Sequence, residues 1–398
     1  MWTTVKLGAL CEVVTKGTTP TSVGFKFESE GINFVKVESL TSNNTFINSK
    51  LAKVSTECHE ALKRSQLKEG DILFSIAGAL GRTAIVTKDI LPANTNQALA
   101  IVRLKENANV DKRFLLYVLN SESTKEQSES NKGGVAQQNL SLSQLKNYEI
   151  TLPPLAEQQR IVAKLDAVFS SISKAETLLV EKEKEVSNIF EAQVRGYFAE
   201  NVLGAEFKKL SEVSEYFNGL TYSPKDVCDE GVIVLRSSNI QDGKIELNDL
   251  VRVKKNIKEK LIVKPSDILI CSRNGSKRLI GKSALIGDSS EEMTFGTFMM
   301  IVRSELNDYL QWFFKSSLFK QQISQGEHTA INQITRYMLD EVVLPVPSVQ
   351  EREKVNEKIN LLDKEIRDFL AILARQRKEL LKLKASILGQ ELKPSEAA

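Results

Sequence analysis

The sequence predicts an α+β protein in which two similar α/β domains are separated by two long antiparallel coiled-coil helices. First, both halves of the 398-residue chain contain the same features in the same order, repeated after about 195 residues. Second, each half ends in a proline-containing segment, "LPPLAEQQRIV" or "LPVPSVQEREKV", followed by a long stretch rich in Glu and Lys. Third, apolar residues recur in both stretches with alternating spacings of four and three, which is typical of a coiled coil. Together these observations indicate an internal duplication with pseudo-two-fold symmetry.

The duplication is visible in short matching segments. The first half opens with "VKLGALCEVVTKGTTP" and "GINFVKVESL", and the second with "FKKLSEVSEYFNGLTYSP" and "GVIVLRSSNI". Residues 67–86 and 263–286 each contain a turn, a "GDIL" or "SDIL" strand, a glycine-containing loop with a basic residue, and another strand. An aromatic-rich helical segment follows in each half, and the length of the repeat indicates a duplicated domain rather than a solenoid. We expect a first domain at 1–152, a central helix at 153–200, a second domain at 201–345 and a distal helix at 346–398.

Each long helix has an apolar seam that continues for several heptads. In the first helix the predicted seam consists of Ile161, Leu165, Val168, Ile172, Ala175, Leu179, Val186 and Ile189. In the second it consists of Val355, Ile359, Leu362, Ile366, Phe369, Leu373, Leu380, Leu383 and Ile387. Because the first helix leads from one domain to the next, the second must run back along it to bury its seam. The alternative is that both stretches are solvated linker helices.

The starts of the helices carry local signals. Pro345 and Pro347 keep the chain extended, and Ser348 with Glu351 matches a capping box. The first helix lacks this pair, and its start depends on Pro153–Pro154 and on Glu157 near the positive end of the helix.

Composition and missing motifs narrow the function classes. With 41% hydrophobic and 26% charged residues, no long apolar run and no signal-peptide pattern, the chain is expected to be soluble and cytoplasmic, with no membrane partner. Its four cysteines have no CxxC spacing, and Cys58–His59 is the only adjacent pair of soft metal ligands, so we expect no metal site. Amino-methyltransferase, dinucleotide-binding and Walker A motifs are absent, so we expect no catalysis and no cofactor in this chain.

The distribution of charge points to nucleic acid. The net charge is only +3, but residues 252–282 form a basic cluster with Glu259 and Asp267 as its only acidic residues. Such a cluster can neutralise DNA phosphates. Two similar domains held at a fixed separation by a rod suit duplex DNA, because reading heads must lie about 34–36 Å, or a multiple of it, apart. We therefore expect double-stranded DNA as a partner.

Candidate DNA-binding residues come from loops at corresponding positions of the repeat. Arg commonly reads guanine and Asn or Gln reads adenine, while Lys, Ser and Thr mostly hold phosphates. The candidates in the first half are Lys16, Thr18, Thr19, Lys36, Arg82, Asn94, Asn96 and Gln97. Those in the second half are Arg236, Ser237, Asn239, Arg273, Asn274, Lys277 and Arg278. For each residue the alternative is a solvated side chain or a turn cap. Residues 131–141 and 326–336 could also close on DNA or simply complete each domain.

Four groups of residues carry a family resemblance: "LPPLAEQQRIV", "GTTP" with "GINFVKVESL", "GLTYSP" with "GVIVLRSSNI", and "SDILICSRNGS" with "GKSALI" and "TFGTFMMIVR". Over nearly its whole length the chain resembles the specificity subunit of type I restriction-modification enzymes, with two target recognition domains and spacer helices. The resemblance implies a non-catalytic subunit that reads a bipartite DNA site, one half per domain, and docks two modification subunits. It implies that those partners methylate adenine with S-adenosylmethionine, and that restriction subunits using Mg and ATP can join. The second proline-to-helix segment departs from the Glu-Gln-Gln pattern of the first, so the two partner contacts need not be equivalent.

Two other classes of function remain open from the sequence. A stand-alone repressor would bind one DNA sequence tightly without a methyltransferase. A coiled-coil scaffold would bind protein through its domains and would not bind DNA.

Overall fold

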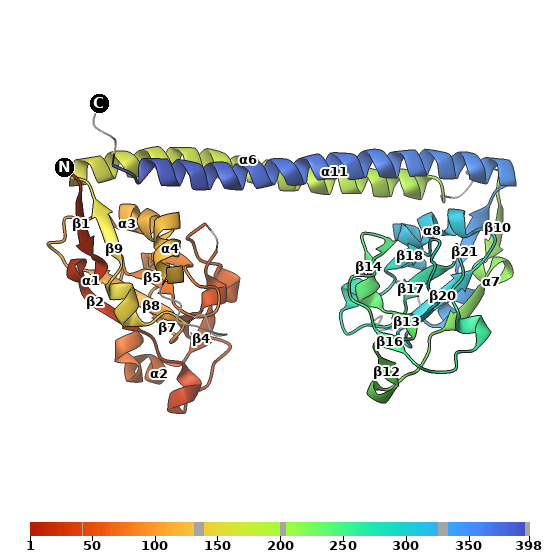
Figure 1. The fold of residues 1–398 in the computed structure, drawn as a ribbon, viewed down its shortest axis with the longest axis horizontal. Helices are drawn as coiled ribbons and strands as arrows, with labels where there is room; N and C mark the ends of the chain where they lie inside the picture. Colours follow the sequence, from red (N-terminus) through yellow and green to blue (C-terminus); the bar gives the residue numbers. More distant parts are fainter. Residues whose placement is uncertain (42, 131–138, 200–203, 325–332, 395–398) are drawn as a thin grey trace. The chain divides into compact units, whose positions relative to one another are not determined.

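The computed structural model describes residues 1–41, 43–130, 139–199, 204–324 and 333–394, which form two compact units. Unit 1 contains Met1–Leu178 and Arg375–Ala398, and unit 2 contains Leu179–Ala374. Each unit therefore combines one globular head with parts of the two long helices α6 (Leu155–Gly196) and α11 (Val349–Glu391) (Figure 1). The predicted fold class, two α/β domains with two long helices, is confirmed.

Head 1 is built on two sheets. The antiparallel sheet has the order β2-β8-β5-β6, and the smaller sheet has the order β4-β3-β7, with β3 and β7 parallel. The strands are β2 (Cys11–Lys16), β3 (Ile32–Val35), β4 (Ala52–Val54), β5 (Ile72–Ser75), β6 (Thr83–Ile85), β7 (Ala93–Thr95) and β8 (Leu99–Leu104). A separate ribbon of β1 (Thr3–Lys6) and β9 (Glu149–Leu152) leads into α6.

Head 2 repeats this topology. Its antiparallel sheet has the order β11-β20-β17-β18, and its second sheet has the order β12-β16-β13-β19, with β13 and β19 parallel. The strands are β11 (Glu215–Asn218), β12 (Val227–Cys228), β13 (Val232–Leu235), β16 (Arg252–Val253), β17 (Ile268–Cys271), β18 (Ser283–Leu285), β19 (Met293–Phe295) and β20 (Met299–Arg303). The ribbon of β10 (Glu206–Lys209) and β21 (Val343–Val346) leads into α11.

Apart from α2 of head 1, the shorter helices correspond between the heads. Head 1 contains α1 (Leu7–Leu10), α2 (Thr56–Ala61), α3 (Lys112–Leu119), α4 (Glu122–Ser130) and α5 (Leu142–Lys146). Head 2 contains α7 (Leu210–Val213), α8 (Asn307–Lys315), α9 (Ser317–Ser324) and α10 (Arg336–Asp340). Figure 1 shows α3 and α8 between the sheets of their own head and the long helices.

The central strand of each head is buried on both faces. In β5, Ile72 and Phe74 join the core shared with α3 and α6, whereas Leu73 joins the core between the two sheets. In β17, Ile268 and Leu269 divide in the same way. Because successive side chains of a strand point to opposite faces, a strand covered on both sides must be apolar throughout. This explains the unbroken apolar runs after "GD" and "SD".

The starts of the long helices agree in part with the sequence. The Oγ of Ser348 accepts a hydrogen bond from the backbone N–H of Glu351 at 3.4 Å, which confirms the cap of α11. At the start of α6, buried Gln158 accepts from the backbone N–H of Asp111 and donates to the carbonyls of Asn109 and Pro153. The first Gln of "EQQR" is therefore buried and joins the start of α6 to head 1.

In unit 1 the two long helices run antiparallel, as predicted. Lys164 Nζ of α6 lies 2.7 Å from Glu391 Oε1 of α11, and the Phe169 ring lies 5.2 Å from Lys384 Nζ. As the residue number rises along α6, that of the contacting residue in α11 falls, so the two helices run in opposite directions. No helix in the described part of the chain is both long enough and apolar enough to cross a membrane.

Three positions of the predicted seams are wrong. Ile189, Phe369 and Leu383 are 50%, 40% and 48% exposed. Val194 of α6 and Leu388 of α11 are buried instead, in the cores of head 2 and head 1 respectively. Near Ile189 and Leu383, toward the ends of the helices, each helix packs against a head, and the head determines which face is buried there. The heptad pattern considers only helix-to-helix packing.

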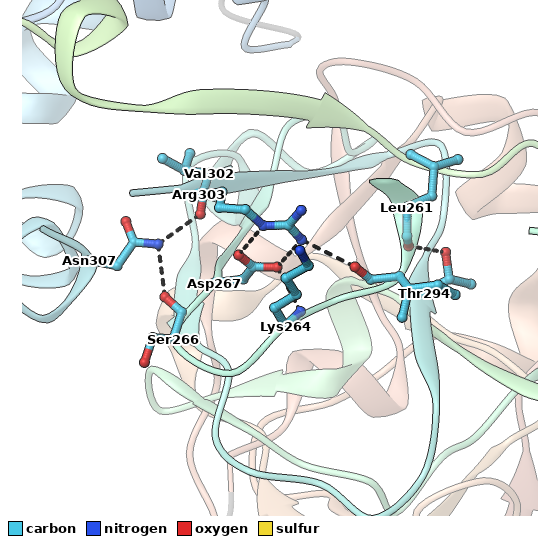
Figure 2. A network of polar contacts seen from close by, with 9 residues as sticks. Leu261, Lys264, Ser266, Asp267, Thr294, Val302, Arg303 and Asn307 are labelled. Carbon is cyan, nitrogen blue, oxygen red and sulfur yellow. Dashed lines mark hydrogen bonds and ion pairs between the residues drawn. The ribbon is translucent and has the colours of Figure 1, made fainter. Parts of the chain in front are cut away.

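A buried ion pair recurs in both heads and links the central strand to its neighbour (Figure 2). Asp267, which precedes β17, accepts two hydrogen bonds from Arg303 at the end of β20 and one from the backbone N–H of Lys264. Asp71 and Arg103 make the same bidentate pair in head 1. The hydrogen bonds that Arg303 donates to Asp267 raise the pKa of Arg303. The charge of the Asp267 carboxylate is thus neutralised by Arg303, which lies outside residues 252–282. Asp267 therefore does not reduce the positive charge of the basic cluster at residues 252–282.

Replacing Asp267 with Ala should lower the free energy of unfolding by about 3 kcal/mol, because it leaves a largely buried Arg303 and the Lys264 N–H without their acceptor. The matched control is Glu341→Ala, which removes the exposed partner of Lys209 and should cost less than about 1 kcal/mol. Urea unfolding of both variants measures the difference. Equal losses would contradict a structural role for the buried pair.

Candidate DNA-recognition surfaces

The candidate loops of head 1 converge at one end because of how the strands pair. Val35 at the end of β3 pairs with Thr95 at the end of the parallel strand β7, so the loops after both strands leave the same edge. Ser75 at the end of β5 pairs with Leu99 at the start of β8, and Lys16 pairs with Ala100. These pairings bring together loops that are far apart in sequence. We call residues 16–19, 36–40, 76–82 and 96–98 loop end 1.

The corresponding pairings in head 2 create loop end 2. Leu235 of β13 pairs with Phe295 of β19, Cys271 pairs with Met299, and Asn218 pairs with Met300. Loop end 2 consists of residues 218–221, 236–239, 272–282 and 296–298. Each head therefore presents one such surface.

The side chains of loop end 1 contact one another across the loops. The Thr19 hydroxyl donates to Gln97 Oε1, and Arg64 Nη2 donates to Thr18 Oγ1 at 3.0 Å. Arg82 is exposed and reaches the carbonyl of Leu40 at 3.4 Å. Five candidates thus come together here, and they are Lys16, Thr18, Thr19, Arg82 and Gln97. Lys36 follows β3 and places its ammonium 4.1 Å from the centre of the Phe27 ring.

In loop end 2 the structure brings Ser237 and Asn274 together through a hydrogen bond of 3.2 Å. Arg273 is exposed, and its guanidinium carbon lies 6.0 Å from the centre of the Phe298 ring. Lys277 and Arg278 are exposed on the 3-10 turn Lys277–Leu279. This surface therefore carries three exposed cations on one loop.

Two candidates are buried, and their selection as DNA contacts was wrong. Asn94 is 0% exposed within β7 rather than in a polar loop, and its amide donates to the Leu62 carbonyl and Ser65 Oγ. Asn239 is 1% exposed and donates to the carbonyls of Glu246 and Asp249. Both amides are thus engaged in hydrogen bonds inside the domain, as buried polar groups usually are.

Three further candidates use part of their side chain in a hydrogen bond within the protein. Asn96 Oδ1 accepts from the Ala98 N–H, and Asn274 Oδ1 accepts from the Ser276 N–H, so both side chains cap their own turns. Arg236 donates to the Asp249 carboxylate at 2.7 Å. Of these three residues, only Arg236 would have to exchange an ion pair for a DNA phosphate or base.

Two surface residues were missed by the sequence analysis. Arg64 reaches loop end 1 from the 3-10 turn Lys63–Ser65, and Phe298 of loop end 2 is 55% exposed. An exposed phenyl ring beside Arg273 is suited to contacts with a thymine methyl group. "TFGTF" contains Phe298, but strand periodicity alone does not distinguish an exposed aromatic residue in a loop from a core one.

Two further predictions concern the segments 131–141 and 326–336 and the Cys58–His59 pair. Most of 131–141 and 326–336 lies outside the described residues. Cys58 is buried in α2, and His59 Nδ1 is hydrogen-bonded to Asn94 Oδ1. Within the described ranges, no group of three or more His, Cys, Asp or Glu side chains is arranged to hold a metal ion.

A close backbone approach holds two loops together in each head. A Cβ on Gly17 would lie 1.9 Å from the Thr95 carbonyl oxygen, and one on Gly219 would lie 2.0 Å from that of Gly296. Only glycine fits at such a distance. The chain leaving β2 or β11 is thereby fixed against the loop after β7 or β19.

Comparison with known proteins defines the class to which this duplicated fold belongs. The family model of the type I restriction modification DNA specificity domain matches residues 1–182 and again residues 203–386. The chain belongs to this family and contains its domain twice, which confirms the resemblance and the internal repeat.

Relatives and solved structures agree with this assignment. The chain is 31% identical over 189 residues to the type I restriction enzyme EcoKI specificity subunit of Escherichia coli, a match covering 45% of this chain and 40% of that subunit. It is 24% identical over 423 residues to the putative type I restriction enzyme MjaX specificity subunit of Methanocaldococcus jannaschii, covering 98% and 92% of the two chains. A chain solved in a study of complex assembly and conformational transition of the type I R-M system has the same fold. Its TM-score is 0.74 at 18% identity, covering 98% of this chain and 97% of that chain.

Replacing Gly219 with Ala should destabilise head 2 by about 2 kcal/mol, because the new methyl group overlaps the Gly296 carbonyl. Gly275→Ala is the matched control in the same loop end, since no atom lies within 4 Å of its Cβ position, and it should change stability by less than about 0.5 kcal/mol. Urea unfolding measures both variants. If both behave alike, the close approach does not hold the loops.

Proposed function

We propose that this chain is the DNA-recognition subunit of a type I restriction-modification complex and that each head reads one half of a bipartite DNA site. The observation that carries the proposal is the convergence of polar and basic loops at one end of each duplicated family domain. A surface of this kind can contact base edges and the flanking phosphates together. The two heads are then two readers in one chain.

The two loop ends differ in the side chains they present, which predicts two different half-sites. Loop end 1 exposes the Gln97 amide and the Arg82 guanidinium, suited to adenine and guanine. Loop end 2 exposes Arg273, Phe298 and the Lys277–Arg278 pair. Because loop end 2 has more exposed cations, its DNA contacts should contribute more of the salt dependence of binding.

We propose further that α6 and α11 dock two adenine methyltransferase subunits and set the number of base pairs between the half-sites. Several large apolar side chains of these helices are exposed, and a partner protein would bury them. They are Leu178, Val180, Ile189, Leu361, Phe369, Ile372, Leu381 and Leu383. In this proposal the chain is not catalytic. S-adenosylmethionine binds in the methyltransferase partners, and Mg and ATP bind in restriction subunits that join the complex.

Head duplication tests the proposal. Each head is closed by the same backbone hydrogen bond, from Leu7 N to Tyr148 O and from Leu210 N to Val342 O, both 2.8 Å. A chain in which residues 7–148 replace residues 210–342 therefore has matched junctions. In complex with its methyltransferase partner, it should methylate sites containing two copies of the half-site that head 1 reads. Sequencing a methylated random DNA library identifies those sites.

The control is the reciprocal chain, in which residues 210–342 replace residues 7–148, and it should select two copies of the other half-site. Retention of the native bipartite site by either chain would show that the heads do not carry the specificity. Methylation by neither chain, although both assemble with the partner as shown by size-exclusion chromatography, would also contradict modular reading.

A further inference from the structure

A basic cavity lies within unit 2, away from the candidate loop residues. It has a volume of about 310 Å3, and its walls come from the β14–β15 hairpin, the region of β18, α8 and α11. The hairpin consists of β14 (Ile240–Gln241) and β15 (Lys244–Ile245), with Asp242 and Gly243 at its turn. Figure 1 shows β14, β18 and α8 on the side of head 2 that faces the long helices of this unit. A pocket of this size accepts a small ligand.

Two donors at the cavity, Trp312 Nε1–H and the Lys315 ammonium, have no hydrogen-bond acceptor in the described residues. Trp312 of α8 is 2% exposed, and its indole Nε1–H has no hydrogen-bond acceptor among the residues that the structure describes. Lys315, one turn further along α8, is half-buried, and its side chain makes neither a hydrogen bond nor an ion pair within the described part of the chain. Its ammonium lies 4.4 Å from the centre of the Trp312 ring. A buried donor without an acceptor is costly, and a half-buried ammonium without a carboxylate partner is destabilised, so a bound anion would satisfy both.

The charges of the walls are unbalanced. Three cations, Lys244, Lys315 and Arg367, line the cavity, and Asp363 is the only carboxylate among the lining residues. Asp363 already pairs with Arg367, four residues later in α11. Burial, followed by the positive charges of Arg367 and Lys244, lowers the pKa of Lys315 to about 8. At neutral pH Lys315 is therefore still mostly protonated, in a cavity with excess positive charge.

The turn of the hairpin is adapted to this cation. A Cβ on Gly243 would lie 3.1 Å from Lys315 Cε, and the backbone of Gly243 has a φ of 73°. Glycine adopts this conformation without strain and leaves room for the end of the Lys315 side chain. The hairpin thus closes over Lys315 and brings Lys244 to the same cavity.

In head 1 the polar side chains at the corresponding positions of α3 bind to other groups of the chain. Ser121 and Ser316 both donate to the carbonyl three residues earlier, which aligns Tyr117 with Trp312 and Asn120 with Lys315. In head 1 the Tyr117 hydroxyl donates to Asp166 of α6, and the Asn120 amide donates to Thr83 Oγ1 and the Leu116 carbonyl. Those polar groups have hydrogen-bond partners in the chain itself, whereas Trp312 Nε1–H and the Lys315 ammonium have no acceptor in the described residues.

From this geometry we infer that the cavity lined by Lys244, Trp312, Lys315 and Arg367 binds a small phosphate-type anion, supplied as free phosphate or as the phosphate of a nucleotide. The anion accepts hydrogen bonds from Trp312 Nε1–H and the Lys315 ammonium, while Lys244 and Arg367 balance its charge. Because the walls belong to head 2 and to α11, the bound anion strengthens their contact within unit 2.

Intrinsic fluorescence of the full chain tests this site. The sequence contains two tryptophans, so Trp2→Phe leaves Trp312 as the only indole reporter. Titration with inorganic phosphate should give a saturable change in Trp312 emission. Adding Lys315→Met should weaken the binding at least about tenfold, because a hydrogen bond to a charged group is lost. Lys320→Met, at an exposed lysine on α9, is the matched control and should leave the affinity unchanged.

The pH dependence provides a second readout. Sulfate keeps its charge between pH 7 and 10, so any change in its affinity reports the protein. Its binding should weaken as the pH rises above about 8, where Lys315 loses its proton, and this dependence should disappear in Lys315→Met. Without ligand, Lys315→Met should raise the melting temperature at pH 7, because it removes a partly desolvated ammonium that Arg367 and Lys244 repel. The same melting curves show that the variant is folded.

Parallel titrations with AMP and ATP separate the two sources of the anion. Tighter binding of a nucleotide than of inorganic phosphate assigns the site to a nucleotide, and the reverse assigns it to free phosphate. The inference is wrong if neither phosphate nor a nucleotide gives a saturable signal. It is also wrong if Lys315→Met binds as tightly as the parent, or if Trp312 responds only to duplex DNA, which would make the cavity part of the DNA surface.

Discussion

The bidentate pair between Asp267 and Arg303, and its counterpart between Asp71 and Arg103, is the contact on which each recognition surface depends. Asp267 stands just before β17 and Arg303 ends β20, so the pair fixes these antiparallel strands at one end. Loop end 2 emerges at their other end, where Cys271 pairs with Met299. A slip of one residue would move every side chain of a fully buried strand to the wrong face. A buried pair at one end therefore sets the positions of the loops at the other.

The sequence predicted the features that depend on local pattern, and it failed where tertiary contacts decide. The strands after "GD" and "SD", the duplication and both long helices follow from apolar periodicity and turn residues. Asn94 and Asn239 were misassigned because an amide that binds buried backbone has the same local sequence signature as one exposed to DNA. Ile189 and Leu383 were misassigned because the heads, rather than the partner helix, select the buried face near the ends of α6 and α11.

The duplication makes each head a reference for the other. Both heads keep the groups that maintain the fold, namely the Asp–Arg pair, the close glycine approach and the hydrogen bond that closes each head. They differ in the exposed loop residues and in the contacts that join α3 or α8 to the long helices. Tyr117 has a hydrogen-bond acceptor on α6, whereas Trp312 Nε1–H and the Lys315 ammonium have none in the described residues. The two heads thus differ in the loop ends, which would read a half-site, and around α3 and α8, where head 2 would bind a ligand.

The central claim is that this chain determines where a methyltransferase acts on DNA. The most direct measurement is base-modification sequencing of genomic DNA from the source cell, with the gene intact and with it deleted. The account predicts that deletion removes adenine methylation from one split motif, two short blocks separated by a fixed number of unspecified bases. An identical pattern of methylation in both strains, with the chain expressed in the first, would contradict it.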